Sequence, residues 1–293
     1  MPDDTTSTSP SAAAPAAQDM LSSLKSSLKK ITIEDGDVAE ELYRVEGDLL
    51  LDEDQLEIYA QQREALEKER SLQKERAALG AGDVAPQEGR SSLVGVTSNG
   101  KLVRWKPGLV LTYCVLKNTF SSTERYEKAV AGMKQATWAW ENTCGITFQH
   151  KSELDNSNGT ANPGTLFTVR EIDAGGQFIA AAFFPNDPKN RRRVLIDPSY
   201  FDQNLSFDPV GVLRHELGHV LGFRHEHIRS QAPPQCPDET MAETLDLTQY
   251  DPQSVMHYFC GGVGSRTLAI TDIDRIGSQK LYGMPFSSFN YVE

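Results

Sequence analysis

The sequence predicts a mixed α/β (α+β) domain that follows a mostly helical N-terminal segment, and three observations lead to this prediction. Beyond residue 93, stretches typical of strands (109–115 and 194–196) alternate with a stretch typical of a helix (129–141). Residues 52–79 consist of helix-forming residues with acid–base pairs at helical spacing. Residues 1–20 are rich in Ser, Thr, Pro and Ala, a composition typical of disorder.

These observations divide the chain into three parts. Residues 1–30 are expected to be a disordered lead, residues 31–90 a largely helical segment, and residues 91–293 the main folded domain. Residues 52–79 read most simply as a solvent-exposed helix. The stretch PQEGRSS (residues 86–92) reads as a linker before the domain.

The composition excludes several classes of partner. The formal charge is −12, from 29 Lys and Arg against 41 Asp and Glu, and the largest basic run is three arginines at 191–193. No basic cluster therefore predicts a nucleic-acid partner. No apolar run approaches the length of a membrane span.

The stretch VLRHELGHVLGFRHEH (residues 212–227) holds four of the six histidines. His215 and His219 are four residues apart, so a helix places both on one face, where two imidazoles can bind one metal ion. Glu216 lies next round the helix and can reach a water on that metal. Gly222 permits a sharp turn that ends the helix and brings His225 back as a third ligand.

Three neutral imidazoles, an open fourth position and an adjacent carboxylate describe a catalytic site for one zinc ion. Zinc lowers the pKa of water towards neutrality, and Glu216 can take the proton. An isolated pair of histidines four residues apart also occurs by chance, or as satisfied core histidines. The addition of Gly222 and His225 at fixed spacing disfavours those alternatives. His227 has no spacing argument, and we expect it to cap a turn or face solvent.

The pattern from His215 to His225 resembles the signature of the metzincin zinc peptidases. Glu226, which follows the third histidine, is typical of the astacin branch. Downstream, the stretch SVMHY (residues 254–258) resembles the astacin Met-turn. The resemblance implies that Met256 forms an apolar floor under the zinc and that Tyr258 contacts the metal or the oxyanion. His257 is expected to face away from the metal.

The resemblance also implies an architecture and a reaction. The expected fold is a metzincin fold with two lobes around a zinc cleft, and residues 271–283 resemble its closing helix. An extended substrate would pair with the strand at residues 179–184. There we expect Ile179, Ala181 and Phe183 to bind substrate. The resemblance implies a monomer that hydrolyses peptide bonds in proteins or peptides, with Glu216 as the base. Glu226 would help to anchor the mature N-terminus beneath the site.

The stretch YRVEGDLLLDED (residues 43–54) resembles the astacin pro-segment motif Phe-x-Gly-Asp, with Val45 in place of the phenylalanine. In such a pro-segment Asp48 would bind the zinc and displace the catalytic water. The chain would then be a latent zymogen, processed between about residues 76 and 92, with Arg90–Ser91 as the best single site. An ordinary Gly-Asp turn is the alternative interpretation.

The four cysteines suit either two disulfides or four reduced thiols. We favour a pair between Cys236 and Cys260, which bracket the segment around the Met-turn. Cys144 lies where astacins place a bridging cysteine, but the usual partner near the C-terminus is missing. The N-terminus has neither the charge nor the apolar stretch of a secretory signal, so secretion by another route is expected and an intracellular location stays open.

Two alternative functions stay open at this point. One is a non-catalytic module that keeps zinc and binds peptide. Non-catalytic relatives usually lose the base, whereas this chain keeps Glu216 and Tyr258. The other is an intracellular effector or toxin peptidase, which the missing signal favours and the cysteines disfavour.

Overall fold

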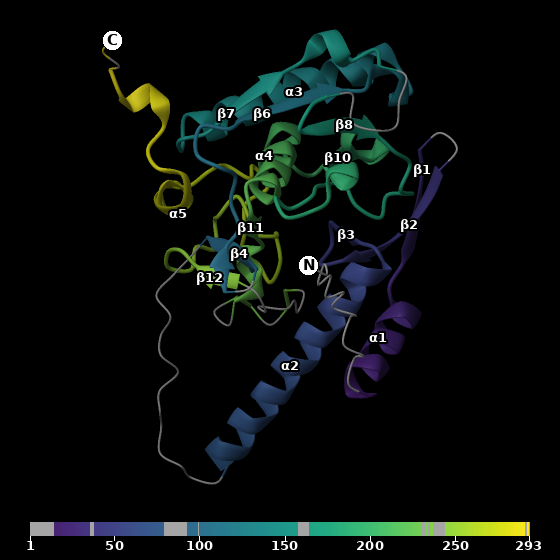
Figure 1. Cartoon of the computed structure of the whole chain (residues 1–293), viewed down its shortest axis with the longest axis vertical. Helices are drawn as coiled ribbons and strands as arrows, with labels where there is room; N and C mark the ends of the chain where they lie inside the picture. Colours follow the sequence, from purple (N-terminus) through teal and green to yellow (C-terminus); the bar gives the residue numbers. More distant parts are fainter. Residues whose placement is uncertain are drawn as a thin grey trace, which may run out of the picture.

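The structure is a computed structural model of the whole chain. It describes residues 15–35, 38–78, 93–98, 100–157, 164–229, 232–233, 235–236, 244–290 and 292. The proposed cleavage site at Arg90–Ser91 and most of the preceding linker lie outside these residues. Figure 1 shows the arrangement of the elements.

The N-terminal segment contains two helices and a small antiparallel sheet. The elements are α1 (Pro15–Ser27), β1 (Lys30–Asp35), β2 (Val38–Val45), β3 (Leu49–Leu51) and α2 (Glu53–Ala78), and the sheet order is β1-β2-β3. One expectation was wrong here: residues 15–27 are helical rather than disordered, because α1 packs on α2. Residues 30–51, for which no helix was expected, are mostly strands.

A physical reason for the strands is visible in the hairpin β1–β2, which we call the docking hairpin (residues 30–45). Ile31 and Ile33 alternate with polar residues, so both point to one face of the strand. That face, together with Leu42, packs against Ala174, Phe178, Ala181 and Leu195 of the catalytic domain. The docking hairpin has few apolar residues, and these become buried by packing against the catalytic domain.

The predicted helix at residues 52–79 is confirmed as α2. Its first turns are buried: Leu56 and Ala60 are fully enclosed and contact Leu24 of α1. Ile58, which lies between these two residues in the sequence, and Leu72, further along the helix, are about half exposed, at 53% and 48%. Figure 1 shows α2 as a long helix that extends away from the body of the molecule.

The upper part of the catalytic domain is a five-stranded sheet with two long helices. The sheet order is β7-β6-β8-β10-β9, with every pair parallel except β10–β9. The strands are β6 (Val110–Val115), β7 (Thr147–His150), β8 (Phe167–Glu171), β9 (Ala180–Ala181) and β10 (Arg193–Ile196), and the helices are α3 (Thr123–Glu141) and α4 (Pro209–Val220). The predicted strands 109–115 and 194–196 and helix 129–141 are confirmed. Strand β9 forms the antiparallel edge of the sheet.

The lower part is less regular. It contains β4 (Val94–Ser98), β5 (Lys101–Leu102), β11 (Phe223–Arg224), β12 (Thr244–Asp246) and α5 (Asp272–Tyr282). Strand β4 pairs with β11 and β12 on its two sides, and β5 also pairs with β4. Helix α5 confirms the helix expected at residues 271–283. It starts with a capping box in which Thr271 and Asp274 bond each other's backbone N–H.

One apolar core joins the two parts. Trp140 of α3, Leu217 and Leu221 of the α4 region, Phe223 of β11 and Leu281 of α5 all belong to it. Because α4 contributes buried residues along most of its length, its position between the sheet and the lower part is fixed. The predicted mixed α/β class is confirmed, and α4 carries the histidine motif through the centre of the molecule.

Candidate active site

Helix α4 begins and ends where its sequence predicts. Asp208 caps the N-terminus by accepting a hydrogen bond from the Gly211 N–H at 3.0 Å, and Pro209 occupies the first turn. The helix ends at Val220, and Gly222 adopts a φ of +90°, a conformation that L residues rarely take. The chain therefore turns sharply and runs into β11 and His225.

The structure brings the three predicted histidines together. The rings of His215 and His219 lie 4.9 Å apart between centroids, and His225 lies 5.3 Å from His215 and 4.8 Å from His219. The Nε2 atoms of His219 and His225 are 3.2 Å apart. All three side chains are buried, so bulk water does not compete with a metal ion for their ring nitrogens.

Backbone carbonyls orient two of the imidazoles. Nδ1 of His215 lies 2.7 Å from the Val255 oxygen, and Nδ1 of His219 lies 2.8 Å from the Phe223 oxygen. A carbonyl oxygen only accepts, so we assign the ring proton to Nδ1, which leaves the Nε2 lone pair for a metal. Burial lowers the pKa of His219 to about 4, so this ring is neutral at physiological pH.

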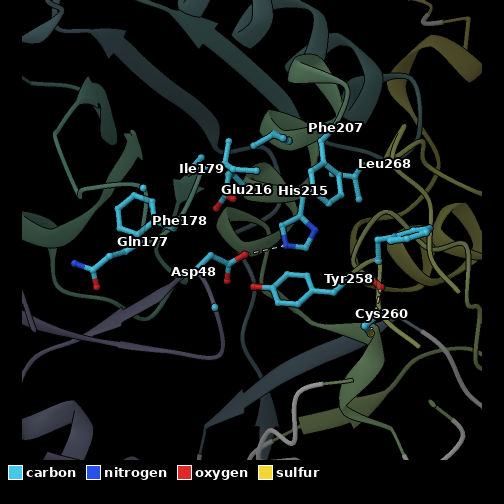
Figure 2. Close-up of a pocket in the computed structure, with 15 residues that line it drawn as sticks. Asp48, Gln177, Phe178, Ile179, Phe207, His215, Glu216, Tyr258, Cys260 and Leu268 are labelled. Atoms are coloured by element: carbon cyan, nitrogen blue, oxygen red, sulfur yellow. Dashed lines mark hydrogen bonds and ion pairs between the residues drawn. The ribbon is translucent and has the colours of Figure 1, made fainter. Parts of the chain in front are cut away.

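Asp48 of the N-terminal segment lies against the same three rings. One carboxylate oxygen is 3.1 Å from His225 Nε2 and 3.7 Å from His219 Nε2, and the other is 3.3 Å from His215 Nε2. Burial would raise the pKa of Asp48, but the histidines hold it well below its ordinary value. Figure 2 shows Asp48 facing His215 across this contact.

These four residues fit a zinc ion. Each offers one ligand atom, and the four atoms lie within 4.8 Å of one another. Among the described residues, the short contacts of His215 Nε2 and Asp48 Oδ1 do not have hydrogen-bond geometry, although both atoms are buried. Buried polar atoms without partners are unfavourable, and a metal ion between them would satisfy both. Three imidazole nitrogens and a carboxylate oxygen are a common ligand set for zinc.

Glu216 is buried beside the cluster, with only 2% of its surface exposed. Its carboxylate shares a pocket with Asp48, as Figure 2 shows. Burial, and then the charge of Asp48, raise the pKa of Glu216 well above its ordinary value. A carboxylate with a raised pKa can accept a proton in one step of a reaction and donate it in the next.

The Met-turn is held beneath the histidines by buried hydrogen bonds. Asp274 of α5 accepts from the Ser254 hydroxyl at 2.6 Å and from the Val255 N–H at 2.9 Å. Met256 is fully buried, and a Cβ at Gly218 would collide with its sulfur. The missing side chain at Gly218 therefore allows Met256 to pack directly against α4.

Tyr258 lies over the histidine cluster. Its ring centroid is 4.4 Å from His225 and 5.8 Å from His215, and its hydroxyl donates to the Glu46 carbonyl at 2.7 Å. His257 turns the other way, because its Nδ1 meets the Tyr258 carbonyl oxygen and its Nε2 the Tyr250 hydroxyl. His257 is outside the four-residue cluster.

The expectation for His227 was wrong. Its side chain is buried, stacked 4.4 Å from the Tyr258 ring and 5.0 Å from the His225 ring. The short 3-10 turn Glu226–Ile228 directs it inward. His227 therefore packs behind the catalytic groups instead of facing solvent.

Glu226 is fully buried, and its Oε1 accepts a hydrogen bond from the Asp251 N–H at 3.1 Å and lies 3.2 Å from Arg229 Nε. Burial raises the pKa of Glu226 to about 8. The backbone N–H of Glu226 donates to the Met256 carbonyl at 2.8 Å, so this residue joins the segment after His225 to the Met-turn.

An apolar pocket of about 420 Å³ opens beside the cluster. Asp48, Glu216 and Tyr258 lie at its polar end, and its apolar wall is formed by Phe178, Ile179, Phe207, Val212 and Leu268. Of the three residues expected to bind substrate, Ile179 lines this pocket. Ala181 is buried under the docking hairpin, and Phe183 packs in the main core against Trp105. Their side chains therefore point away from the pocket.

Sequence reasoning missed several residues around this site. Phe207 and Leu268 have no motif, because they reach the pocket from separate loops. Arg224 lies between the second and third histidines and forms a buried ion pair with Glu46 of the N-terminal segment. A charged residue inside an otherwise apolar buried stretch was the available signal for Arg224.

The cysteines form one disulfide. Cys236 and Cys260 are bonded across a sequence separation of 24 residues, which confirms the favoured pair. Cys114 and Cys144 are buried free thiols, and burial raises the pKa of Cys144 to about 12. The disulfide ties the chain just after Tyr258 to the segment that follows the histidine motif.

The family model of the peptidases described as matrixin (Peptidase_M10) matches residues 104–257, more than half of the chain. The zinc metalloproteinase nas-3 of Caenorhabditis elegans is 32% identical over 90 residues. That match covers 28% of this chain and about 30% of the length of the curated relative.

Among solved structures, the high choriolytic enzyme 1 of medaka fish (Oryzias latipes), described as a hatching enzyme zinc-protease, is similar over 62% of this chain and 94% of its own. The identity is 19% and the TM-score 0.41.

Proposed function

This chain belongs to the matrixin family of zinc metallopeptidases, and we propose that it hydrolyses peptide bonds in proteins and is made as a latent zymogen. The observation that carries the proposal is the convergence of His215, His219, His225 and Asp48 on one buried point, beside Glu216. The first three come from the catalytic domain and the fourth from the N-terminal segment.

The three histidines would hold one zinc ion through Nε2. When bound, zinc polarises a carbonyl group and lowers the pKa of water. Glu216 then takes a proton from the attacking water and passes it to the leaving amine. Tyr258 donates a hydrogen bond to the oxygen that becomes negatively charged, an effect worth about 2–4 kcal/mol at comparable sites.

The substrate is a protein or peptide in an extended conformation. Strand β9 is the antiparallel edge of the five-stranded sheet and continues from Ile179 at the pocket, so its free edge offers backbone groups for pairing. The apolar pocket would accept a side chain next to the scissile bond. The chain would act as a monomer.

In the full-length chain, residues 46–48, which we call the cleft loop, fill the position of the substrate. Asp48 faces the three histidines, and the Glu46 carbonyl receives the hydrogen bond of the Tyr258 hydroxyl. A Cβ at Gly47 would collide with the Tyr258 ring, so only glycine allows the loop to approach this closely. Asp48 therefore takes the open position at the metal site. At the same time, the Glu46 carbonyl takes the hydrogen bond that the Tyr258 hydroxyl would donate to the substrate.

Activation would follow from removal of residues 31–90 together with the lead. Cleavage at Arg90–Ser91 would leave a domain of residues 91–293 and release the cleft loop from the histidines. The new amino terminus could then approach the buried carboxylate of Glu226, which lies 3.2 Å from Arg229 Nε.

We propose that the enzyme works outside the cell. The Cys236–Cys260 disulfide suits an oxidising compartment. Among the described residues, no helix is both long enough and apolar enough to cross a membrane.

The proposal is tested by measuring casein hydrolysis by zinc-loaded full-length protein before and after limited trypsin treatment, with the trypsin inhibited before the assay, and with and without a chelator. We expect about one zinc per chain, little activity before treatment, and activity afterwards that the chelator abolishes. Treated protein that carries zinc and cleaves no protein substrate would contradict the proposed activity. N-terminal sequencing of active enzyme that began at Met1 would contradict the maturation step.

A further inference from the structure

Two polar residues outside the cluster of metal ligands are linked to the backbone of Tyr258. The His257 side chain is fully buried. Its Nδ1 lies 2.6 Å from the Tyr258 carbonyl oxygen, and its Nε2 lies 2.7 Å from the Tyr250 hydroxyl. Neither His257 nor Tyr250 lines the pocket that holds Glu216 and Tyr258, and neither belongs to the four-residue metal cluster. The mechanism proposed above therefore leaves both residues without a role.

The chemistry of the atoms fixes the direction of both hydrogen bonds. Burial lowers the pKa of His257 to about 4, so the ring is neutral at physiological pH and carries one proton. Because a carbonyl oxygen only accepts, this proton lies on Nδ1, and Nε2 accepts from the Tyr250 hydroxyl. Tyr250 keeps the proton that it donates, since burial raises its pKa to about 12. The hydrogen bonds therefore run from Tyr250 through His257 to Tyr258.

Tyr250 is held in place through the residue that follows it, Asp251. The Asp251 N–H donates to Glu226 Oε1 at 3.1 Å, and the Asp251 carboxylate accepts from the Thr271 hydroxyl at 2.7 Å. Thr271 is the N-cap of α5, and Glu226 directly follows the third histidine. Tyr250 therefore approaches His257 from a segment that is anchored at two separate elements.

The Tyr258 carbonyl lies in a crowded place. A Cβ at Gly264 would come within 2.6 Å of this oxygen. A crowded carbonyl that loses its hydrogen-bond donor is unfavourable, so loss of the His257 N–H would favour a shift of the Tyr258 backbone. The hydroxyl lies at the far end of the Tyr258 side chain, and Figure 2 shows it directed toward Asp48. A small backbone shift would therefore displace the hydroxyl from the catalytic centre.

We propose that His257 and Tyr250 are positioning residues for Tyr258, whose backbone they hold so that its hydroxyl meets the oxygen that becomes negatively charged during peptide hydrolysis. This inference rests on the proposed function, because it requires Tyr258 to act in the transition state. A misplacement of about 1 Å at a reacting centre can lower a rate by about a hundredfold. Loss of the Tyr250–His257 pair should therefore lower kcat although neither residue contacts the substrate.

The substitution Tyr250→Phe removes only the hydroxyl that donates to His257. Zinc-loaded full-length protein is activated with trypsin, the trypsin is inhibited, and kcat and KM are measured on one peptide. We expect kcat to fall by about five- to tenfold, the size of one hydrogen bond, with KM and zinc content close to wild type. Tyr126→Phe is the matched control, because its hydroxyl donates to Asp155 at 2.7 Å, outside the pocket. This control should keep the wild-type kcat.

A double variant separates positioning from a general loss of structure. In the Tyr258→Phe enzyme, the addition of Tyr250→Phe should leave kcat unchanged, because the hydroxyl that the pair positions is already absent. A general structural defect would instead lower kcat by the same factor with and without the Tyr258 hydroxyl. The cycle therefore measures whether Tyr250 acts through Tyr258.

Two further variants test the donor on His257. His257→Asn can still donate from near the position of Nδ1, whereas His257→Gln places its amide near the position of Nε2. At equal zinc content, the Asn variant should have the higher kcat. A Gln variant that equals or exceeds the Asn variant would contradict the role of the His257 N–H.

The outcomes distinguish failure of this inference from failure of the proposed function. A wild-type kcat in Tyr250→Phe, or an equal loss in the two backgrounds, would overturn the positioning role and leave the peptidase activity standing. An unchanged kcat in Tyr258→Phe would overturn the catalytic role of Tyr258, and the positioning role with it. An activated wild-type chain that carries zinc and cleaves no peptide would overturn both proposals.

Discussion

The N-terminal segment contacts the catalytic domain in two regions that differ in chemistry. The cleft loop (residues 46–48) makes polar contacts with buried groups: Asp48 with the histidines, Glu46 with Arg224, and the Glu46 carbonyl with Tyr258. The docking hairpin (residues 30–45) instead makes apolar contacts through Ile31, Ile33 and Leu42. Ion pairs from Glu40 to Arg191 and Arg193 border this apolar contact.

The difference indicates that the N-terminal segment separates inhibition of the active site from attachment to the catalytic domain. Burying charges is unfavourable unless partners are well placed, so the cleft loop contributes inhibition at defined atoms more than binding energy. Apolar burial is non-directional and does not depend on a metal, so the hairpin contributes attachment. Mutations in the two regions should therefore change different observables.

The largest effect on activity is expected from substitution of Glu216, which lines the cleft. This substitution leaves the cleft loop and the docking hairpin unchanged. Glu216→Ala should lower the kcat of the processed enzyme by about a thousandfold, because it removes the general base. Its zinc content should equal that of wild type, since Glu216 is not a ligand, and this is measured by metal analysis. The matched variant His219→Ala should instead lose zinc and stability together. Near-full activity in Glu216→Ala would contradict the assignment of the base.

The next effect tests the cleft loop alone. Asp48→Ala in the full-length chain should raise activity by about a hundredfold or more, because breaking a buried ionic contact costs about 3–5 kcal/mol. Casein hydrolysis before any cleavage measures this. Asp52→Ala serves as a control, because Asp52 is four residues away and pairs with Arg191. If Asp48→Ala is as silent as wild type while the trimmed domain is active, the segment blocks the cleft through another contact.

Tyr258 contacts the cleft loop and also has a proposed catalytic role, so its substitution should change both the turnover of the processed enzyme and the latency of the full-length chain. In the processed enzyme, Tyr258→Phe should lower kcat about thirtyfold or more with a smaller change in KM, because the hydroxyl acts in the transition state. In the full-length chain, the same substitution should remove the hydrogen bond from Tyr258 to the Glu46 carbonyl and so weaken the binding of the cleft loop. Kinetics of both forms measure these effects. A change confined to KM would move Tyr258 from catalysis to substrate binding.

The smallest effect on catalytic activity is expected from the hairpin. Leu42→Ala removes buried apolar atoms and should weaken the docking contact by about 2–5 kcal/mol. Hydrogen exchange of the β1 and β2 amides should accelerate in this variant, whereas Asp48→Ala should leave it close to wild type. Equal acceleration in both variants would show that the two regions form one cooperative unit, and the division of tasks proposed above would be wrong.

Local spacing explains which features the sequence could predict. His215 and His219 lie close together because a helix places residues four apart on the same face. Gly222 marks the turn that brings His225 back to them. The docking hairpin could not be predicted this way, because Ile31, Ile33 and Leu42 are buried only by contact with distant parts of the chain.

The same reasoning explains the remaining misses. His227 was expected at the surface, but the stacked rings of His225 and Tyr258 bury it, and no sequence pattern records that stacking. The Glu46–Arg224 pair joins residues that are far apart in the sequence. Phe183 follows the edge strand β9 and was expected to bind substrate, yet the main apolar core takes its side chain.

The most direct test of latency is a crystal structure of zinc-loaded full-length protein, with anomalous data collected at the zinc edge. We expect one zinc bound by His215, His219, His225 and a carboxylate oxygen of Asp48, the latter at about 2.0–2.2 Å. A zinc ion held by the three histidines and a water, with the Asp48 carboxylate outside bonding distance, would contradict the proposal that Asp48 keeps the enzyme latent.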